Sequence, residues 1–261
     1  MTRFPPPDAA PGGFAVFADS HLGSAPGDGE DFLGALSEVV ARGLTTVVLL
    51  GDIFNYFIGD ARFETPLVRQ ILAGWTELAA RGVSLRYVEG NRDFFLSGTR
   101  WAAPFSRYGI ADGLETGGRR YAFVHGDRVN TEDVPYRFWR LLSKNPVSWG
   151  VMKILPGALA RRIVSRTEAR LYRTNFRHKK GFPTVHFLAE AARARAAGYD
   201  ELLVGHFHRE WRLEGECAVH LLPSWVEERK HAEIAPDGSL TVVEEPTAHR
   251  GLRRASRRGR P

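Results

Sequence analysis

The chain has 261 residues, of which 43% are hydrophobic and 25% are charged, and its formal net charge is +6. This composition is ordinary for a soluble globular protein, and the length suits one large domain or two small ones. No stretch approaches the ~20 uninterrupted apolar residues that a membrane-spanning helix requires. A single cysteine, Cys217, excludes an intramolecular disulfide and fits a reducing compartment.

The two ends of the chain differ in composition from the rest. Residues 1–13, MTRFPPPDAAPGG, lack the pattern of a secretory signal, and we expect them to form a flexible leader. Residues 250–261 contain six arginines and no acid, so the charge of this stretch alone equals the net charge of the whole chain, +6. A short Arg-rich end is typical of a solvated segment, and we expect residues 246–261 to be a disordered tail. Outside residues 131–180, the sequence shows no cluster of aromatic and basic residues on which nucleic-acid bases could stack. We therefore expect no specific nucleic-acid partner.

Apolar strands alternate with amphipathic helices in the first half of the chain. FAVFAD, at residues 14–19, predicts a buried strand that ends on a polar residue. A helical pattern follows over residues 32–40, and TTVVLLGD, at residues 45–52, is an apolar run typical of a strand covered on both faces. A second helix over residues 66–82 leads into another strand over residues 83–91.

The second half of the chain contains more strands and a helical excursion. RRYAFVHGD and ELLVGHFH, at residues 119–127 and 201–208, again predict apolar strands whose last residues are polar. Helical patterns dominate the region between them, and further strands are predicted near residues 217–245. This order predicts an α/β layered sandwich over residues 14–245 with a mixed sheet.

Polar clusters end five of the predicted strands: Asp19-Ser20-His21, Gly51-Asp52, Gly90-Asn91, His125-Gly126-Asp127 and Gly205-His206-Phe207-His208. A single Gly-Asp or D-x-H is ordinarily only a turn. Because α/β sheets place ligand sites at the carboxyl ends of their strands, five such clusters together predict one convergent site. Carboxylate and imidazole ligands suit Mn, Fe or Zn, and the lack of thiols disfavours a structural zinc site.

The predicted ligand set is large enough for two metal ions. Its members are Asp19, His21, Asp52, Asn91, His125, His206 and His208. Two ions ~3.5–4 Å apart can clamp a phosphoryl group, and we expect Asp52 to bridge them from a rigid strand end. A spacing of two residues places Asp19 and His21 on one side of an extended segment, and the same holds for His206 and His208. Asp93 and Asp127 are expected to orient ligands.

The ordered set D-x-H, GD, GN, H and GHxH resembles the calcineurin-like metallophosphoesterases, over about residues 19–243. The resemblance implies an αββα sandwich with mixed sheets, a helical lid insertion at residues 131–180 and two divalent ions, with Mn²⁺ expected. It implies that one ion is bound by Asp19, His21, Asp52 and His208. It implies that the other is bound by Asp52, Asn91, His125 and His206.

Arg92 departs from most of that superfamily, which has a histidine after the Gly-Asn pair. A histidine can protonate a poor leaving group, whereas a guanidinium with a pKa above 12 cannot. Arginine instead offers a fixed positive fork for phosphate oxygens, which suits a diphosphate whose leaving group is already a stable anion. The simpler alternative is an ion pair between Arg92 and Asp93.

GNRDF, together with GDIFNYFIGD and HGDRVNTEDVPYRFWR, is similar to one subgroup, the UDP-2,3-diacylglucosamine hydrolases of lipid A synthesis. The resemblance implies attack of water on the α-phosphate of the UDP-linked acylated glucosamine, giving UMP and 2,3-diacylglucosamine 1-phosphate. It implies catalytic roles for Asn91, Arg92 and His206. The substrate contacts that it implies are Asn91, Arg92, Asp133, Asn175, His178 and His206.

The lid contains a basic run, RRIVSRTEARLYRTNFRHKK, at residues 161–180, and together they lead us to expect a lipid partner. The resemblance implies that the lid lines an acyl-chain pocket and that its basic residues meet the anionic inner-membrane surface, so we expect a cytoplasmic, peripherally associated protein. The simpler alternative for the lid is a helical hairpin with its own small core.

Two positions leave the exact substrate open. Leu171 stands where the subgroup has a serine, and His178 stands where it has a lysine. The alternative function is therefore a metallophosphoesterase that acts on another nucleotide-diphosphate lipid or on a phosphodiester. A scaffold that has lost catalysis usually loses metal ligands, and all seven are present here, so we expect no obligate protein partner.

Overall fold

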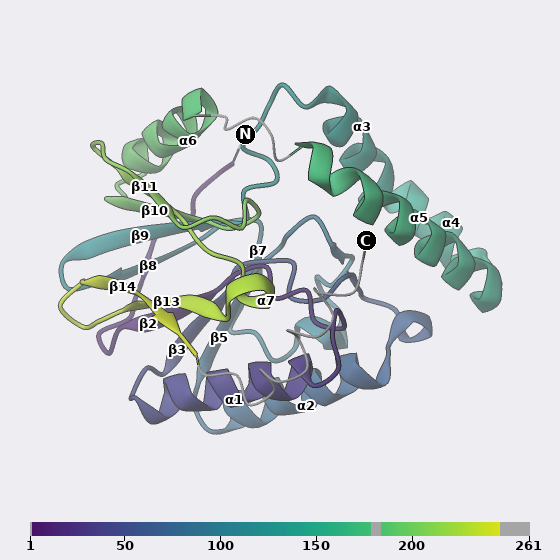
Figure 1. Cartoon of the computed structure of the whole chain (residues 1–261), viewed down its shortest axis with the longest axis horizontal. Coiled ribbons are helices and arrows are strands. Elements are labelled where there is room, and N and C mark those ends of the chain that lie inside the picture. Colours follow the sequence, from purple (N-terminus) through teal and green to yellow (C-terminus); the bar gives the residue numbers. More distant parts are fainter. Residues whose placement is uncertain (1, 179–183, 246–261) are drawn as a thin grey trace, which may run out of the picture.

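The computed structural model describes residues 2–178 and 184–245, with the side chains of all of these except 135 and 168–178. Two six-stranded sheets lie face to face, in the orders β1-β8-β9-β10-β12-β11 and β14-β13-β2-β3-β5-β7. We call them the β9 sheet and the β2 sheet. Helices α1 (Asp28–Ala41) and α2 (Pro66–Ala80) lie outside the β2 sheet, and α6 (Thr184–Ala196) lies outside the β9 sheet (Figure 1). The expected αββα sandwich with mixed sheets is confirmed.

The β2 sheet has a parallel half and an antiparallel half. Its parallel strands are β2 (Phe14–Phe17), β3 (Thr46–Leu49), β5 (Ser84–Val88) and β7 (Arg107–Gly109). Its other strands, β13 (Lys230–Ile234) and β14 (Leu240–Glu244), run antiparallel to their neighbours. All residues of β2 are buried, and so are three of the four in β3, as the apolar runs predicted.

The β9 sheet contains three parallel central strands, β9 (Arg119–Val124), β10 (Glu201–Val204) and β12 (Ala218–Leu221). Strand β8 (Asp112–Thr116) is antiparallel to β9, and β11 (Trp211–Leu213) is antiparallel to β12. Strand β1 (Asp8–Ala9) pairs parallel to β8, so the predicted leader over residues 1–13 contains a strand of this sheet. A short pair, β4 (Phe57–Ile58) and β6 (Asp93–Phe94), lies beside the sandwich.

Three apolar layers hold the sandwich together. The middle layer, between the two sheets, includes Phe14, Phe123 and Ile234, each fully buried. Trp75 of α2 belongs to the layer beneath the β2 sheet, and Phe187 of α6 belongs to the layer above the β9 sheet. These layers fix the relative position of the two sheets, and hence of their carboxyl ends.

The region predicted as a lid contains three helices, α3 (Val134–Ser143), α4 (Pro146–Ile154) and α5 (Gly157–His178), which lie across one end of the sandwich (Figure 1). Asp133 and Asn145 cap α3 and α4, and a proline stands in the first turn of each, as helix starts favour. The shorter helical segments are η1 (Ala61–Phe63), η2 (Arg100–Ala102) and α7 (Trp225–Glu228). Within the described part of the chain, no helix combines the length and apolar character needed to cross a membrane.

Candidate metal centre

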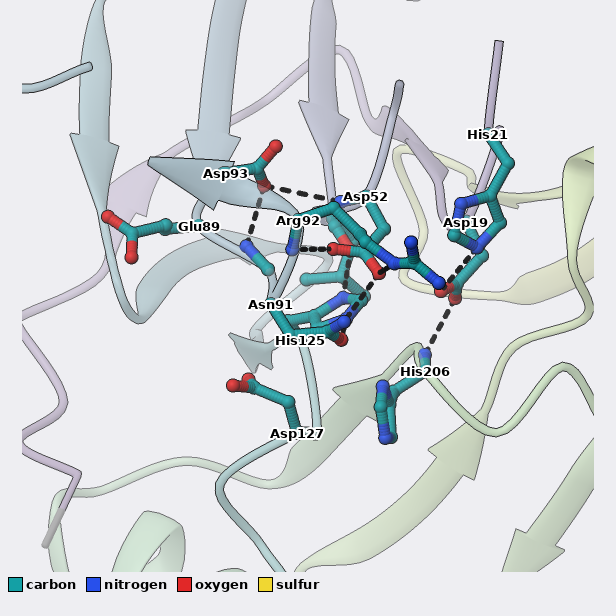
Figure 2. A network of polar contacts seen from close by, with 12 residues as sticks. Asp19, His21, Asp52, Glu89, Asn91, Arg92, Asp93, His125, Asp127 and His206 are labelled. Carbon is teal, nitrogen blue, oxygen red and sulfur yellow. Dashed lines mark hydrogen bonds and ion pairs between the residues drawn. The ribbon is translucent and has the colours of Figure 1, made fainter. Parts of the chain in front are cut away.

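The seven predicted ligands gather where strands of both sheets end. Asp19, Asp52 and Asn91 follow β2, β3 and β5, and the histidines follow β9, β10 and the turn after β2. Because β2, β3 and β5 are parallel to one another, as are β9 and β10, each sheet brings its carboxyl ends to one edge. Figure 2 shows that these two edges face each other, so that side chains from both sheets point into one space.

Five of the seven residues adopt a left-handed backbone conformation, with φ between 42° and 68°: Asp19, His21, Asp52, His206 and His208. Such values are uncommon outside glycine, and each costs on the order of 1–3 kcal/mol. The extended segments that we expected at residues 19–21 and 206–208 are therefore absent. Tight turns at the strand ends bring these side chains together instead, and backbone strain of this kind is concentrated at functional sites.

The glycines of the Gly-Asp and Gly-Asn pairs are required by close packing. A Cβ atom on Gly90 would lie 2.3 Å from Oδ1 of Asp52, and one on Gly51 would lie 2.6 Å from Nδ1 of His125. Gly51 also has a φ of 74°, which other residues rarely adopt. The two glycines therefore allow the loops after β3 and β5 to touch.

Asp19, His21 and His208 form the first group of potential ligands. Oδ1 of Asp19 lies 3.3 Å from Nε2 of His208 and 3.9 Å from Nε2 of His21. This oxygen is buried and has no hydrogen-bond partner among the described residues. A buried carboxylate oxygen without a partner is costly, and a bound cation would satisfy it.

Glu227 of α7 orients the first group. Its Oε1 lies 2.8 Å from Nδ1 of His208, which directs Nε2 of that ring toward Asp19. A carboxylate on the outer nitrogen of a histidine is the usual support of a metal-ligating imidazole. No sequence motif connects Glu227 to His208, so the sequence alone does not identify this residue.

Asp19, Asp52 and His125 form the second group. Nδ1 of His125 lies 2.9 Å from the carbonyl oxygen of Leu50, so a proton on Nδ1 leaves Nε2 free to act as a ligand. Nε2 lies 3.6 Å from Oδ2 of Asp52 and 3.1 Å from Oδ1 of Asn91. Asp19 belongs to both groups, and the bridging role expected of Asp52 stays a prediction.

His206 completes the convergence. Its backbone N–H donates to Oδ2 of Asp19 at 2.6 Å, and its ring lies 5.2 Å from the ring of His125. The structure thus places all seven predicted residues at one edge of the sandwich, and their assignment as ligands stays a proposal.

The loop with Arg92 is fixed by two carboxylates. Asp93 accepts hydrogen bonds from the backbone N–H groups of Gly90 at 2.7 Å and Asp52 at 3.2 Å, and from the hydroxyl of Tyr87 at 2.8 Å. Asp52 accepts the backbone N–H of Arg92 at 2.7 Å. The alternative of an Arg92–Asp93 ion pair is wrong, because the carboxylate of Asp93 binds these groups instead.

The guanidinium of Arg92 lies beside the second group of ligands. Its Nε is 4.0 Å from Oδ2 of Asp52 and has no hydrogen-bond partner among the described residues. Nη1 donates a long hydrogen bond of 3.4 Å to the carbonyl oxygen of Asn55. The side chain is therefore held in place while part of its donor capacity is left for another anion.

Protonation of the site suits divalent cations. Burial lowers the pKa of His21 to about 4 and that of His206 to about 4, so both rings are neutral near pH 7. Burial also opposes charge on Asp19 and Asp52, but the neighbouring histidines outweigh it and hold both carboxyl pKa values below their usual range. Although burial favours neutral His125, the carboxylates around it, Asp52 first, raise its pKa to about 10. Two carboxylates with neutral imidazoles match what a divalent ion requires, and an ion would replace the proton on His125.

An apolar cavity of about 240 Å³ separates the lid from the body of the protein. Phe94 and Phe95 line it from the body, and Trp139 and Trp149 line it from α3 and α4. The rings of Phe95 and Trp149 stack at 4.4 Å. Arg92 also lines the cavity, which therefore reaches the metal centre. The Phe95–Trp149 stack joins α4 to the body, and α4 itself has no buried residue. The role of these helices as a lid stays a prediction.

The remaining predicted substrate contacts are less fully described. The side chain of Asp133 caps α3 by accepting the backbone N–H of Tyr136 at 2.9 Å. Asn175 and His178 belong to α5, but their side chains lie outside the described residues, as does that of Leu171. The Arg-rich tail, residues 246–261, also lies outside them.

Comparison with known proteins shows clear relatives, although no protein-family model matches the chain. The chain is 31% identical over 238 residues to a UDP-2,3-diacylglucosamine hydrolase of Bordetella pertussis, covering 86% of this chain and 89% of the relative. It is 30% identical over 195 residues to the protein of that name from Photorhabdus laumondii, covering 74% and 80%. Among solved structures, a dimetal phosphatase from Danio rerio is similar at 14% identity and a TM-score of 0.47, covering 90% of this chain and 99% of that one.

Proposed function

From its membership of the metallophosphoesterase family that includes the UDP-2,3-diacylglucosamine hydrolases, we propose that this chain hydrolyses the diphosphate of UDP-2,3-diacylglucosamine. The products are UMP and 2,3-diacylglucosamine 1-phosphate. The observation that carries the proposal is the position of Arg92, which lies beside Asp52 and also lines the apolar cavity under the lid. In the proposed substrate, a charged diphosphate is likewise joined to a sugar that carries apolar acyl chains, so its two parts match the charged centre and the apolar cavity.

Two divalent ions, which we propose to be Mn²⁺, would be held by the seven convergent residues. The donor set supports this, since it offers buried carboxylates, an amide oxygen and imidazoles but no thiolate. Bound ions would supply an activated water and neutralise charge on the phosphate. In this proposal Asn91 and His206 contact both an ion and the substrate.

Among the side chains of the protein, Arg92 is proposed to bind the diphosphate and stabilise its charge. Its guanidinium binds oxygens of the diphosphate and stabilises the negative charge that develops as the bond to the leaving group breaks. Because the sugar 1-phosphate leaves as a stable anion, no side chain has to protonate it. This accounts for an arginine, which cannot act as an acid near neutral pH.

The lid provides the recognition of the lipid. A cavity of about 240 Å³ falls below the roughly 300–1,000 Å³ of a site for a whole drug-sized ligand, so it suits part of an acyl chain. We assign the polar contacts to Asn91, Arg92, Asp133, Asn175, His178 and His206. Leu171 and His178 are the positions that would adapt the site to a related acylated sugar nucleotide.

Peripheral association with the cytoplasmic side of the inner membrane is part of the proposal. Several large apolar residues of the lid face solvent: Val134, Phe138 and Leu141 on α3, and Val147, Val151 and Ile154 on α4. Each set recurs every three or four residues, which places it on one face of its helix. Such a surface would bring the cavity close to a substrate whose acyl chains lie in the bilayer.

The substrate assay is a paired measurement. Protein with Mn²⁺ is mixed with UDP-2,3-diacylglucosamine and, in parallel, with UDP-N-acetylglucosamine, and UMP release is followed. We expect rapid release from the acylated substrate alone, because only that substrate fills the cavity. Equal rates of UMP release from the two substrates would show that the lid does not recognise the acyl chains. If the Mn²⁺-loaded protein released UMP from neither substrate, the proposed substrate would be contradicted.

A further inference from the structure

We propose that helix α3 of the lid is a positioning element of the metal centre, acting through Lys144, Arg140 and Tyr136. None of these residues lies among the seven candidate ligands. The inference rests on those seven as metal ligands and is independent of which lipid is the substrate.

The first contact is made by Lys144 at the end of α3. Its Nζ donates to the carbonyl oxygen of Gly90 and to Oε1 of Glu89, both at 2.6 Å. Gly90 immediately precedes Asn91, one of the candidate ligands. Lys144 also lies over the ring of Phe94, with Nζ 5.2 Å from the ring centroid. Its side chain is only 12% exposed, so these charge-assisted contacts are made away from bulk water.

Glu89 ties this contact to the sheet. Its second oxygen, Oε2, accepts the hydroxyl of Tyr108 on β7 at 2.7 Å, and its Oε1 lies 3.7 Å from Nη2 of Arg140. The loop over residues 89–93 is therefore held from two directions. Asp93 fixes it to the body by accepting the N–H of Gly90, and Lys144 fixes the carbonyl of the same residue to the lid.

The second contact joins α3 to the loop after β9. Asp127, two residues after His125, is almost fully buried. Its Oδ2 accepts the hydroxyl of Tyr136 at 2.5 Å and Nη1 of Arg140 at 2.9 Å. The expected role of Asp127 in orienting ligands stays a prediction, and the structure shows that its carboxylate binds Tyr136 and Arg140 of α3. Figure 2 shows Glu89 and Asp127 away from His21, toward the loops that carry Asn91 and His125.

The spacing of these residues explains how one helix makes both contacts. Tyr136, Arg140 and Lys144 recur every four residues and so form one polar stripe along α3. Trp139 and Leu142, from another face of the helix, line the apolar cavity. One rigid helix thus contacts the cavity for the acyl chain and, from each of the two sheets, one of the loops that hold candidate ligands.

The expected consequence concerns metal affinity. Groups that hold ligands in place typically change metal affinity or activity by about 10–100-fold when removed. Lys144→Met removes the contact with Gly90 and leaves Glu89 with a weaker partner. We expect it to weaken binding of the ion near Asn91 and His125 by about tenfold or more.

The experiment measures Mn²⁺ binding directly, from the electron paramagnetic resonance signal of free Mn²⁺ during titration of the whole chain. Lys144→Met is compared with Arg137→Met, which removes a charge from the same helix. Nη1 of Arg137 donates to the carbonyl oxygen of Thr131 at 3.1 Å, six residues beyond His125, and not to the residues beside Asn91 or His125. We expect one of two ions to bind at least about tenfold more weakly in Lys144→Met and both to bind normally in Arg137→Met.

A second variant keeps the test decisive if Lys144→Met does not fold. Glu89→Gln removes the charge partner while Lys144 keeps the Gly90 carbonyl, so we expect a smaller loss of Mn²⁺ affinity in the same ion. Affinities equal to those of Arg137→Met in both variants would overturn the positioning role. If the unaltered chain did not bind Mn²⁺, the proposed metal centre itself would be overturned. The result of the lipid assay bears neither on the positioning role of α3 nor on the metal centre.

Discussion

At the residue scale, Arg92 distinguishes this centre from one that protonates its leaving group. Its side chain is buried, lies against Asp52 and retains an unpaired Nε among the described contacts. A fixed guanidinium can bind two phosphate oxygens at once, which an ammonium group cannot. Under the proposed function, this residue would favour a substrate with a second phosphate over a simple ester.

This account predicts a substrate-dependent effect of Arg92→Ala. We expect kcat/KM to fall by about 10²–10³ on the diphosphate substrate, the size of effect seen when one charge-stabilising donor is removed. The loss should be smaller on an aryl phosphodiester with an equally good leaving group, and Arg92→Lys should recover only part of the activity. Equal losses on the two substrates would show that Arg92 does not bind the second phosphate.

The sequence identifies the residues at the strand ends but not those that support them. Asp19 and His21 stand in a recognisable order along the chain, and apolar runs locate the strands that carry them. Glu227 lies 19 residues from His208, and Lys144 lies 55 residues from Glu89. Such contacts depend on how α7 and α3 pack, so no local pattern contains them.

At the element scale, α3 and α4 differ from α2, which covers the β2 sheet. Trp75 and Ile71 of α2 are fully buried, whereas Phe138 of α3 is 66% exposed and Ile154 of α4 is 82% exposed. An exposed apolar face of this kind marks an interaction surface. In the proposed function, this face contacts the membrane that contains the substrate.

The expected result is selective loss of vesicle binding. Phe138→Glu with Leu141→Glu should lower affinity for phosphatidylglycerol vesicles by at least about tenfold, since burying each such side chain contributes about 1.5–3 kcal/mol. Val185→Glu with Leu188→Glu is the matched control, because these residues are also exposed but belong to α6 above the β9 sheet. Equal sedimentation of both variants with vesicles would exclude α3 as the docking surface.

Strand prediction succeeded where the segments are apolar and buried on both faces. TVVL in β3 is such a run, and its neighbour β2 is similar. Strand β5, with the sequence SLRYV, is also mostly buried but includes Ser84 and Arg86. Strands β8, with the sequence DGLET, and β11, with the sequence WRL, lack that signal. They become strands because each pairs with a strand already fixed by the core, a tertiary effect that outweighs local propensity.

At the scale of the whole molecule, the sandwich itself assembles the centre. Sheet β2 contributes Asp19 and Asp52 and sheet β9 contributes His125 and His206, so neither sheet has a complete ligand set. The polar strand ends predicted the convergence of these residues, whereas the αββα arrangement followed from the family resemblance that the ordered motifs carry. The left-handed turns were not predictable, because they follow from packing at the strand ends rather than from residue preference.

The residues at these strand ends are proposed to bind two metal ions. Diffraction from crystals grown with Mn²⁺, measured at the manganese absorption edge, would locate the ions. We expect two anomalous peaks roughly 3.5–4 Å apart, one beside Asp19 and His208 and the other beside Asp52 and His125. A single peak, or none within this edge of the sandwich, would contradict this proposal.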